Sequence, residues 1–545
     1  MPARRQKTIK LLSLVLPWVL VILIMAPRLI SPQFGLLDDG AMLAEVRQIL
    51  SGDFSMGHDL QAGRFRPLYW GYFTLVYSLA GPSPFWFYFS QTCLLLILVI
   101  EIQVLMKKMG AKSWQGLAAS LVFVLSVPII ENFYTLSKGE PLQLVFLLLA
   151  MIGFEGLKSN ESGKYRVWRG TAIFFSILAA MLVKETTLAL LPIAAVWAAP
   201  AAFPQKNVSK KRKWAALIFL GAVLLGILAA FGLRALWGTP TLAGGTYTER
   251  YDFSLMSLLN RLARWATLYA FYYHFLVPLA ILTLIMVLRA ELKRWPFKDQ
   301  LFNWLIWIAG WATALIPWEF TEVYYLLPFS LGIAILTGLM APHWASFFKR
   351  DSKAGWVQKA LLGLSIALFL LTLPNYTTHA RTQLTIDRVN QAMLRSVQNI
   401  TPQNGAVLIG MENPTEYVVN IERFLLDRYK RTDIQYDYVN LETLGVLHHY
   451  SKGILVLPYV RNLPDLILRT GVEEKFTIDW REVIIYEMED RLKELDRERE
   501  GFQMFNINLP VVLCPLIGER GYCEVPDPLI DTREFRFGWE VVQIR

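Results

Sequence analysis

Residues 11–50 read LLSLVLPWVL VILIMAPRLI SPQFGLLDDG AMLAEVRQIL, and this stretch decides the fold. Its first half is almost entirely apolar, and about 20 such residues are what an α-helix needs to cross a bilayer. Two adjacent acids, Asp38 and Asp39, follow shortly after this segment ends at Ile30. We therefore expect a membrane-spanning helix with a pair of carboxylates at its outer mouth.

The rest of the chain supports a membrane protein. Of 545 residues, 54% are hydrophobic, 32 are Phe and 18 are Trp, and the mean hydropathy of +0.37 is far above that of a soluble domain. Further apolar runs lie near 84–106, 114–131, 141–157, 214–236, 265–288, 300–318, 324–345 and 357–374. The sequence thus predicts a polytopic α-helical membrane protein in contact with the lipid bilayer.

Basic residues predict the orientation. Arg4, Arg5, Lys7 and Lys10 precede the first span, and the positive-inside rule places such residues in the cytoplasm. No small-residue cleavage motif follows the apolar run, so we expect an anchor and not a removed signal. The other basic clusters lie between spans, and the net charge of +10 therefore reflects topology; we expect no nucleic-acid partner.

The segment 171–203 has basic residues on both sides and is interrupted by Lys184 and Glu185. We expect it to enter and leave the membrane on the same side, as two halves of roughly 13 to 15 residues each, short for full spans. Counting both halves gives about 11 transmembrane helices, an odd number. This count predicts a multi-pass protein of the plasma (inner) membrane, with everything after Pro374 outside the cytoplasm.

Two domains follow from that topology: a membrane domain at 1–374, with a first outer loop at 31–70, and an extracytoplasmic α/β domain at 375–545. The second part is long enough for its own core. Its apolar runs predict strands, and the spacing of apolar residues between them predicts one helix. The expected strands are 406–410, 454–458 and 483–486, and the expected helix is 415–429. Cys514 and Cys523 could form a disulfide in an oxidising compartment.

The acid pair admits two interpretations. Leu43, Val46 and Ile49 are spaced to share one face of a helix on the membrane surface, and an Asp is a favoured N-cap for such a helix. Capping explains one Asp and leaves the other unexplained. A carboxylate near a low dielectric and a like charge tends to have a raised pKa, which suits a proton acceptor.

Where the chain returns to the membrane it carries Arg64, Arg66 and Tyr69. Arg can direct two N–H donors at a phosphate, although Arg and Tyr also favour the headgroup region without any ligand. Charges such as Lys184 and Glu185 at mid-bilayer cost on the order of 3 kcal/mol unless they face a polar cavity or a partner. A Lys–Glu contact is the simple alternative. A later outer loop carries the acidic and aromatic residues Glu319, Glu322, Tyr324 and Tyr325.

Together, the acid pair and the basic, aromatic re-entry resemble the GT-C-type glycosyltransferases, which take sugars from polyprenyl-phosphate carriers; the likeness is to protein O-mannosyltransferases and aminoarabinose transferases. The resemblance covers about residues 10–345. The sequence departs from the family pattern in having one Pro where two are common and Arg66 where Lys is frequent. The matching residues, in order, are Asp38, Asp39, Gly52, Asp53, Arg66, Pro67 and Leu68.

The resemblance implies transfer of a sugar from the carrier to a lipid, cell-envelope glycan or protein acceptor on the outer face, with inversion. Asp38 would be the general base, and Asp39 would orient it, bind the acceptor or ligate a divalent metal. The leaving phosphate would need cations. The expected phosphate-binding residues are Arg66, Arg64 and Lys184, and the expected substrate-binding residues are Glu185, Glu322, Tyr324 and Tyr69.

Two other classes of protein remain open from the sequence. In a transporter or flippase, Lys184 and Glu185 would form the substrate or proton site, although no inverted repeat is visible. In a non-catalytic envelope assembly protein, the acids would be helix caps and the outer domain a docking module. The sugar, the acceptor and the need for a metal are not specified by the sequence.

Overall fold

The computed structural model describes most of the chain. The described residues are 3–36, 38–52, 59, 64–158, 163–202, 210–237, 251–288, 298–318, 322–347, 355–411, 416–440, 453–458, 478–487 and 536–544. Asp53, Glu319, Cys514 and Cys523 lie outside these ranges, so the predictions made for them stay predictions.

Five helices of the described part are long and apolar enough to cross a membrane. They are α5 (Pro84–Lys108), α8 (Glu140–Leu157), α9 (Gly163–Val183), α11 (Lys210–Leu236) and α15 (Leu327–Phe347). Helices α6 (Ser113–Val124) and α7 (Val127–Phe133) make a sixth if they are counted as one span bent by 64°. The chain is thus a helical membrane protein, and the expected total of 11 spans stays a prediction.

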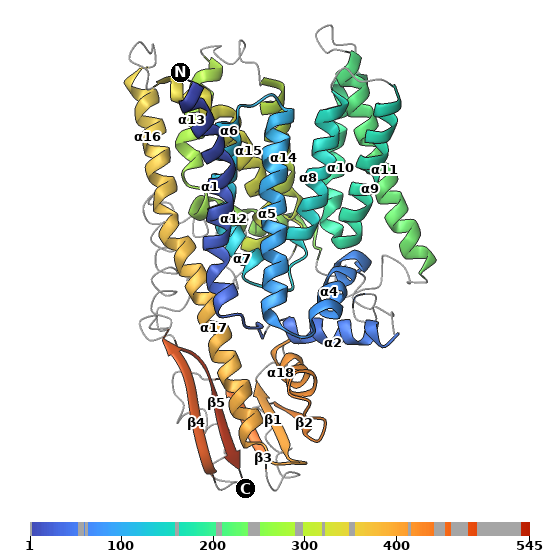
Figure 1. Cartoon of the computed structure of the whole chain (residues 1–545), viewed down its shortest axis with the longest axis vertical. Coiled ribbons are helices and arrows are strands. Elements are labelled where there is room, and N and C mark those ends of the chain that lie inside the picture. The colour runs from blue at the N-terminus through green and yellow to red at the C-terminus, as the bar shows by residue number, and fades with distance from the viewer. Residues whose placement is uncertain are drawn as a thin grey trace.

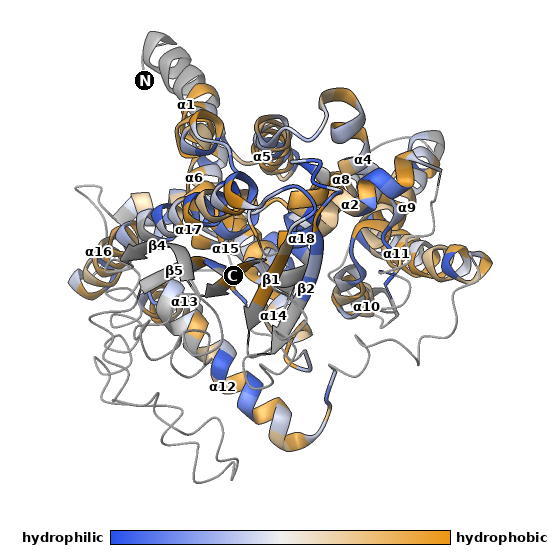
Figure 2. Ribbon diagram, turned by 90° about the horizontal axis from the view of Figure 1, so that it is seen from below, coloured by the Kyte–Doolittle hydropathy of each residue, from blue (hydrophilic) through white to orange (hydrophobic). Residues whose placement is uncertain are grey.

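Further helices complete the bundle. They are α1 (Ala3–Ile30), α4 (Pro67–Ala80), the 3₁₀ helix η1 (Glu185–Ala189), α10 (Leu190–Ala202), α12 (Leu255–Tyr272), α13 (Leu276–Leu288), α14 (Lys298–Ala314), the 3₁₀ helix η3 (Val323–Leu326) and α16 (Trp356–Leu371). Apolar residues predominate along most of the bundle, whereas α12 carries distinct hydrophilic turns (Figure 2).

Two predicted spans differ from the structure. The first half of 171–203 was expected to be short, but α9 has 21 residues because it already begins at Gly163, within the basic loop. Lys184 therefore stands just after the end of a helix that is long enough to span a membrane, and its expected depth in the bilayer stays a prediction. The single span expected at 265–288 is broken between Tyr272 and Leu276 into α12 and α13.

A five-stranded sheet follows the bundle, with strand order β2-β1-β3-β5-β4. The strands are β1 (Ala406–Met411), β2 (Gln435–Asn440), β3 (Gly453–Pro458), β4 (Ile478–Glu487) and β5 (Arg536–Ile544). Strand β1 pairs in parallel with β2 and β3, whereas β5 pairs antiparallel with β3 and β4. The predicted strand positions correspond to β1, β3 and β4, and the predicted helix corresponds to α18 (Glu416–Asp427).

One long helix, α17 (Leu373–Ile400), connects the two parts. It runs from the bundle down to the sheet, and it contacts α7 and α16 as well as β4 and β5 (Figure 1). Its His379 is buried, where Nδ1 is 2.7 Å from Oε1 of Glu131 on α7 and Nε2 is 3.0 Å from the hydroxyl of Tyr272 on α12. Helix α17 is thereby attached to the bundle by side-chain contacts on two neighbouring helices.

The surface helix expected after the acid pair is present as α2 (Asp39–Leu50), which lies across the lower ends of the membrane helices (Figure 1). Helix α18 packs against it from below. Phe34, just before α2, has its ring centroid 5.8 Å from both Phe87 of α5 and Phe424 of α18. The start of α2 is therefore enclosed between the bundle and the region that contains the sheet.

The close approach of α18 to α2 requires glycine at position 40. A Cβ there would stand 2.7 Å from Oδ1 and 2.9 Å from the carbonyl oxygen of Asn420. We expect Gly40→Ala to lower the free energy of unfolding by about 1–3 kcal/mol through overpacking, measured as a lower Tm in detergent.

The control for this substitution is Gly221→Ala in α11, where a new Cβ would meet nothing within 4 Å. Alanine has the higher helix propensity, so this variant should be as stable as the wild type or more stable. A Tm for Gly40→Ala equal to or above that of the wild type would show that α2 and α18 do not pack as described.

Candidate active site

Asp38 has an oriented carboxylate that remains open to solvent. Ser137 Oγ donates a 2.8 Å hydrogen bond to Asp38 Oδ2, and Lys138 Nζ lies 3.8 Å from the same oxygen. The side chain is still 37% exposed. Although Asp38 occupies the N-cap position of α2, its side chain makes no capping hydrogen bond. The carboxylate is thus directed towards the segment 137–138 and not towards the start of its own helix.

Asp39 is in the opposite situation. It is buried, and its Oδ2 accepts a 2.7 Å hydrogen bond from the backbone N–H of Gly35. Burial and the neighbouring carboxylate of Asp387 raise the pKa of Asp39 to about 8. The two adjacent acids therefore differ: Asp38 is partly exposed to solvent, and Asp39 is a buried carboxyl group with a raised pKa.

Beside Asp39, Asp387 of α17 forms an ion pair of 2.6 Å with Arg28 of α1, and both residues are buried. Arg28 also donates to the carbonyl oxygen of Tyr134. Burial raises the pKa of Asp387, whereas Arg28 opposes that shift. Since Arg28 compensates one negative charge, Asp387 is the member of the pair that we expect to be ionised, and Asp39 keeps its proton.

Arg66, predicted as a phosphate ligand, already has a carboxylate partner. Its Nε and Nη2 donate to the two oxygens of Asp59 at 2.9 and 2.6 Å, and Trp70 Nε1 donates to Asp59 at 2.6 Å. Burial alone would raise the pKa of Asp59, but Arg66 holds it below its usual range. The guanidinium also lies 4.4 Å from the ring centroid of Tyr69. Arg66 thus stabilises the segment that leads into α4.

The pKa of Arg64, the second predicted phosphate ligand, is subject to opposing effects. Burial and the nearby Arg66 lower its pKa, while the carboxylates of Asp59 and Glu185 act in the other direction. Glu185 is therefore close enough to interact electrostatically with both arginines. The structure brings these three predicted residues into one neighbourhood, and their predicted roles in binding carrier and sugar stay predictions.

Lys184, the third predicted cation, lies beside two aromatic rings and a carboxylate. Its ammonium pairs with Glu140, and it is 4.8 Å from the ring centroid of Tyr325 and 5.5 Å from that of Tyr324. Lys138 Nζ lies 4.1 Å from the same Tyr324 ring. The Lys–Glu alternative is therefore realised, with Glu140 as the partner. Through Tyr324 the two lysines and Asp38 form one cluster.

Several hydrogen bonds keep this cluster in place. The Tyr69 hydroxyl donates to the carbonyl oxygen of Ser137 at 2.9 Å. Gln143 Nε2 donates to Thr187 Oγ1 at 2.7 Å, which secures the turn that follows Lys184. Glu322, also predicted to bind substrate, is exposed and directly precedes η3. Tyr69 therefore positions Ser137, and Gln143 positions the turn after Lys184.

Sequence reasoning missed Ser137, Lys138 and Glu140, which form a short polar run at the start of α8. The available signal was Ser-Lys-Gly-Glu-Pro at 137–141, with charged residues and a helix-starting Pro at the end of an apolar segment. It also missed Asp59 and Asp387, since nothing local distinguishes an Asp that pairs with a distant Arg.

Comparisons with known proteins identify the fold. No protein-family model and no curated protein sequence matches the chain. Among solved structures, an oligosaccharyltransferase from Archaeoglobus fulgidus in the apo form superposes with a TM-score of 0.50 at 10% identity, over 85% of this chain and 71% of that chain. This chain has the fold of the GT-C glycosyltransferases.

ArnT from Cupriavidus metallidurans is also similar. Bound to undecaprenyl phosphate, it matches with a TM-score of 0.47 at 12% identity, over 87% of this chain and 95% of that chain. In the apo state the TM-score is 0.45 at 12% identity, over 85% and 95% of the two chains. The superposition on the archaeal oligosaccharyltransferase, at a TM-score of 0.50, confirms the resemblance to the GT-C type as a likeness of fold.

The metal considered for Asp39 finds little support in the donor set. Hard divalent cations prefer ionised, accessible carboxylates, whereas Asp39 is buried with its pKa raised to about 8. No group of three His, Cys, Asp or Glu side chains gathers within the part of the chain that the structure describes. Asp39 therefore does not fit the role of a metal ligand.

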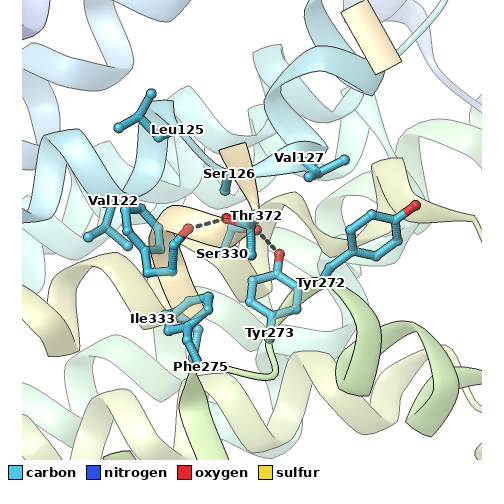
Figure 3. Close-up of a pocket in the computed structure, with 11 residues that line it drawn as sticks. Val122, Leu125, Ser126, Val127, Tyr272, Tyr273, Phe275, Ser330, Ile333 and Thr372 are labelled. Carbon is cyan, nitrogen blue, oxygen red and sulfur yellow. Dashed lines mark hydrogen bonds between the residues drawn. The ribbon is translucent and has the colours of Figure 1, made fainter. Parts of the chain in front are cut away.

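A separate small cavity lies where α6, α7, α12, α15 and α16 meet (Figure 3). It is lined mostly by apolar side chains, and its polar contacts are internal: the Tyr273 hydroxyl bonds to Ser330, and Thr372 Oγ1 donates to the carbonyl oxygen of Phe369. Tyr272 points away from this pair, towards its bond with His379. The cavity is therefore distinct from the cluster around Asp38.

The raised pKa of Asp39 (about 8) predicts a pH-dependent stability. Between the unfolded-state pKa near 3.9 and about 8, the folded protein holds a proton that the unfolded chain does not. The free energy of unfolding should therefore fall by about 1.4 kcal/mol per pH unit from this group as pH rises. Asp39→Asn stays neutral and removes this contribution.

We expect the Tm of Asp39→Asn, relative to that of the wild type, to increase steadily between pH 6 and pH 8, as measured by thermal unfolding in detergent. Other titrating groups are common to both proteins and cancel in the difference. A Tm difference that does not change with pH would mean that Asp39 is ionised in the folded protein.

Proposed function

We propose that this chain is an integral membrane glycosyltransferase that transfers a sugar from a polyprenyl-phosphate carrier to an acceptor hydroxyl on the extracytoplasmic face. The observation that carries the proposal is the open, oriented carboxylate of Asp38, held by Ser137 and Lys138 beside Lys184. The acceptor is a lipid, a cell-envelope glycan or a protein. The shared fold of an archaeal oligosaccharyltransferase is consistent with this class of reaction.

The proposed topology follows the charge pattern of the sequence. The amino terminus is cytoplasmic, residues 1–374 form the membrane domain of the plasma (inner) membrane, and residues 375–545 form an extracytoplasmic α/β domain. Helix α2 and the acid pair then lie at the outer surface, where a carrier lipid exposes its phosphate and where the acceptor arrives.

In the proposed reaction Asp38 removes the proton from the acceptor hydroxyl as the hydroxyl oxygen attacks the anomeric carbon. The bond between that carbon and the carrier phosphate oxygen breaks, and the carrier leaves as polyprenyl phosphate. Attack from the face opposite the phosphate inverts the anomeric centre. Because the leaving group is already an anion, this step needs cations and no protein acid.

Lys184 and Lys138 are the cations that we assign to the carrier phosphate. Both ammonium groups lie at the Tyr324 ring, and Lys138 is only loosely paired with Asp38, at 3.8 Å. Arg66 has its charge matched by Asp59 through two hydrogen bonds. Lys184 is likewise paired, with Glu140, so pairing does not exclude Arg66, and we assign Arg66 and Arg64 to the positive potential near the phosphate. Glu185, Glu322, Tyr324 and Tyr69 remain the proposed substrate contacts.

Asp38→Asn should lower the transfer rate by roughly 10²- to 10⁴-fold, the usual contribution of general-base catalysis. The amide can still accept the Ser137 hydrogen bond, so the fold should be kept. The assay uses purified protein in lipid with a panel of polyprenyl-phosphate sugars and crude membrane extract as acceptor, and it measures the release of free polyprenyl phosphate.

The matched control is Asp433→Asn. This second Asp→Asn change removes a carboxylate that pairs with Arg431, away from α2. It should leave the rate unchanged. Normal turnover in the Asp38 variant would rule out the base, and no release by the wild type from any donor would rule out the transferase.

Lys138→Gln and Lys184→Gln should each raise the donor concentration that gives half the maximal rate, by roughly tenfold to a hundredfold, because a charge-assisted contact to phosphate is lost. In Lys184→Gln the new amide can still donate a hydrogen bond to Glu140, which limits structural damage. Lys158→Gln is the control, since Lys158 also contacts a carboxylate, Glu155, and lies 4.1 Å from a ring, Phe154. An equal effect in all three variants would contradict the assignment.

A further inference from the structure

Helix α2 begins without a cap from its own sequence. Asp38 is at the N-cap position, but its side chain makes no hydrogen bond to the first turn of the helix. Its carboxylate instead accepts from Ser137. The first backbone N–H groups of a helix have no partner within the helix, and an N-cap side chain normally satisfies the N–H of the second or third residue. That partner must come from elsewhere.

Asn420 of α18 supplies it. Its Oδ1 accepts a 2.8 Å hydrogen bond from the backbone N–H of Ala41, the third residue of α2. Asn420 is only 1% exposed, so the bond is shielded from water. The approach depends on Gly40, because a Cβ there would stand 2.7 Å from the same Oδ1. An asparagine 379 positions along the chain thus makes the bond that Asp38 does not make.

Further contacts from the same part of the chain hold the approach to α2. Gln391 Nε2 of α17 donates to the carbonyl oxygen of Phe34 at 3.2 Å, and Arg428 donates to Gln391 at 2.7 Å. A Cβ on Gly35 would lie 3.3 Å from Asp387 Oδ1. Helix α17 therefore contacts the backbone before Asp38, at Phe34, and α18 contacts the backbone after Asp38, at Ala41.

We propose that Asn420 is a positioning residue for sugar transfer: by capping α2 from α18, it leaves the Asp38 carboxylate free to serve as the base. This inference rests on the proposed function of Asp38. In this proposal the region after residue 400 helps to position the base. Loss of the cap lets Asp38 turn back to its own helix, where it can accept from the N–H of Ala41 and is lost to the reaction.

The test compares Asn420→Ala, Asn420→Asp and Asp433→Asn in the full chain. Asn420→Ala should lower kcat roughly five- to tenfold, the population change expected for loss of a cap, with an unchanged KM for the donor. Asn420→Asp keeps an acceptor oxygen beside the helix start and should restore most of kcat. Asp433→Asn should behave as the wild type, since it alters the same region without touching α2.

A second measurement does not depend on turnover. Amide hydrogen exchange of residues 39–45 should be roughly fivefold faster in Asn420→Ala than in the wild type, while exchange in β1 should be unchanged. An unchanged kcat or unchanged exchange of these amides would overturn the inference, and so would equal losses in the alanine and aspartate variants. If the wild type releases no carrier from any donor, the proposed function fails instead, which is a distinguishable result.

Discussion

The buried ion pair between Arg28 and Asp387 is the interaction on which the site depends. It joins the end of α1 to α17, with Arg28 Nη2 2.6 Å from Asp387 Oδ2. The same guanidinium lies 4.8 and 5.2 Å from the rings of Tyr88 and Tyr134 and donates to the Tyr134 carbonyl oxygen. The side chain of Arg28 therefore connects α1 to α5, to the segment after α7 and to α17. Removing one partner of such a pair typically costs about 3–5 kcal/mol, because the other charge stays buried.

That ion pair also explains how two adjacent acids come to differ. Arg28 compensates one carboxylate, that of Asp387, and Asp39 is buried next to it. A second uncompensated charge at this place would be costly, so Asp39 keeps a proton and accepts from the Gly35 N–H. Asp38, one residue earlier, points to the opposite side and is open to solvent. The pair thus combines one buried supporting carboxyl group with one carboxylate available to a substrate.

The sequence predicted the features that are encoded locally. The period of apolar residues placed α2, the strands β1, β3 and β4 and helix α18 close to their positions in the structure. The run Asp38–Asp39 with the re-entry at Arg66 indicated the GT-C fold. Spans were less well delimited where polar residues extend a helix, as at the start of α9, or where a span breaks, as between α12 and α13.

The contacts of the site could not be read from the sequence, because they join positions far apart. Ser137 meets Asp38 across 99 positions, and Asn420 meets Ala41 across 379. No periodicity records such pairs, and hydropathy does not distinguish Asp387 beside Arg28 from an exposed Asp. The different burial of Asp38 and Asp39 likewise arises from tertiary packing and not from either residue's neighbours in the chain.

The most direct test of this active site is a structure of the protein in lipid with polyprenyl phosphate bound. We expect the phosphate density beside Tyr324, within ion-pair distance of Lys138 or Lys184, on the same side of the bundle as the Asp38 carboxylate. A phosphate bound away from both lysines, or on the far side of the bundle from Asp38, would contradict the proposed site and with it the assignment of Asp38 as the base.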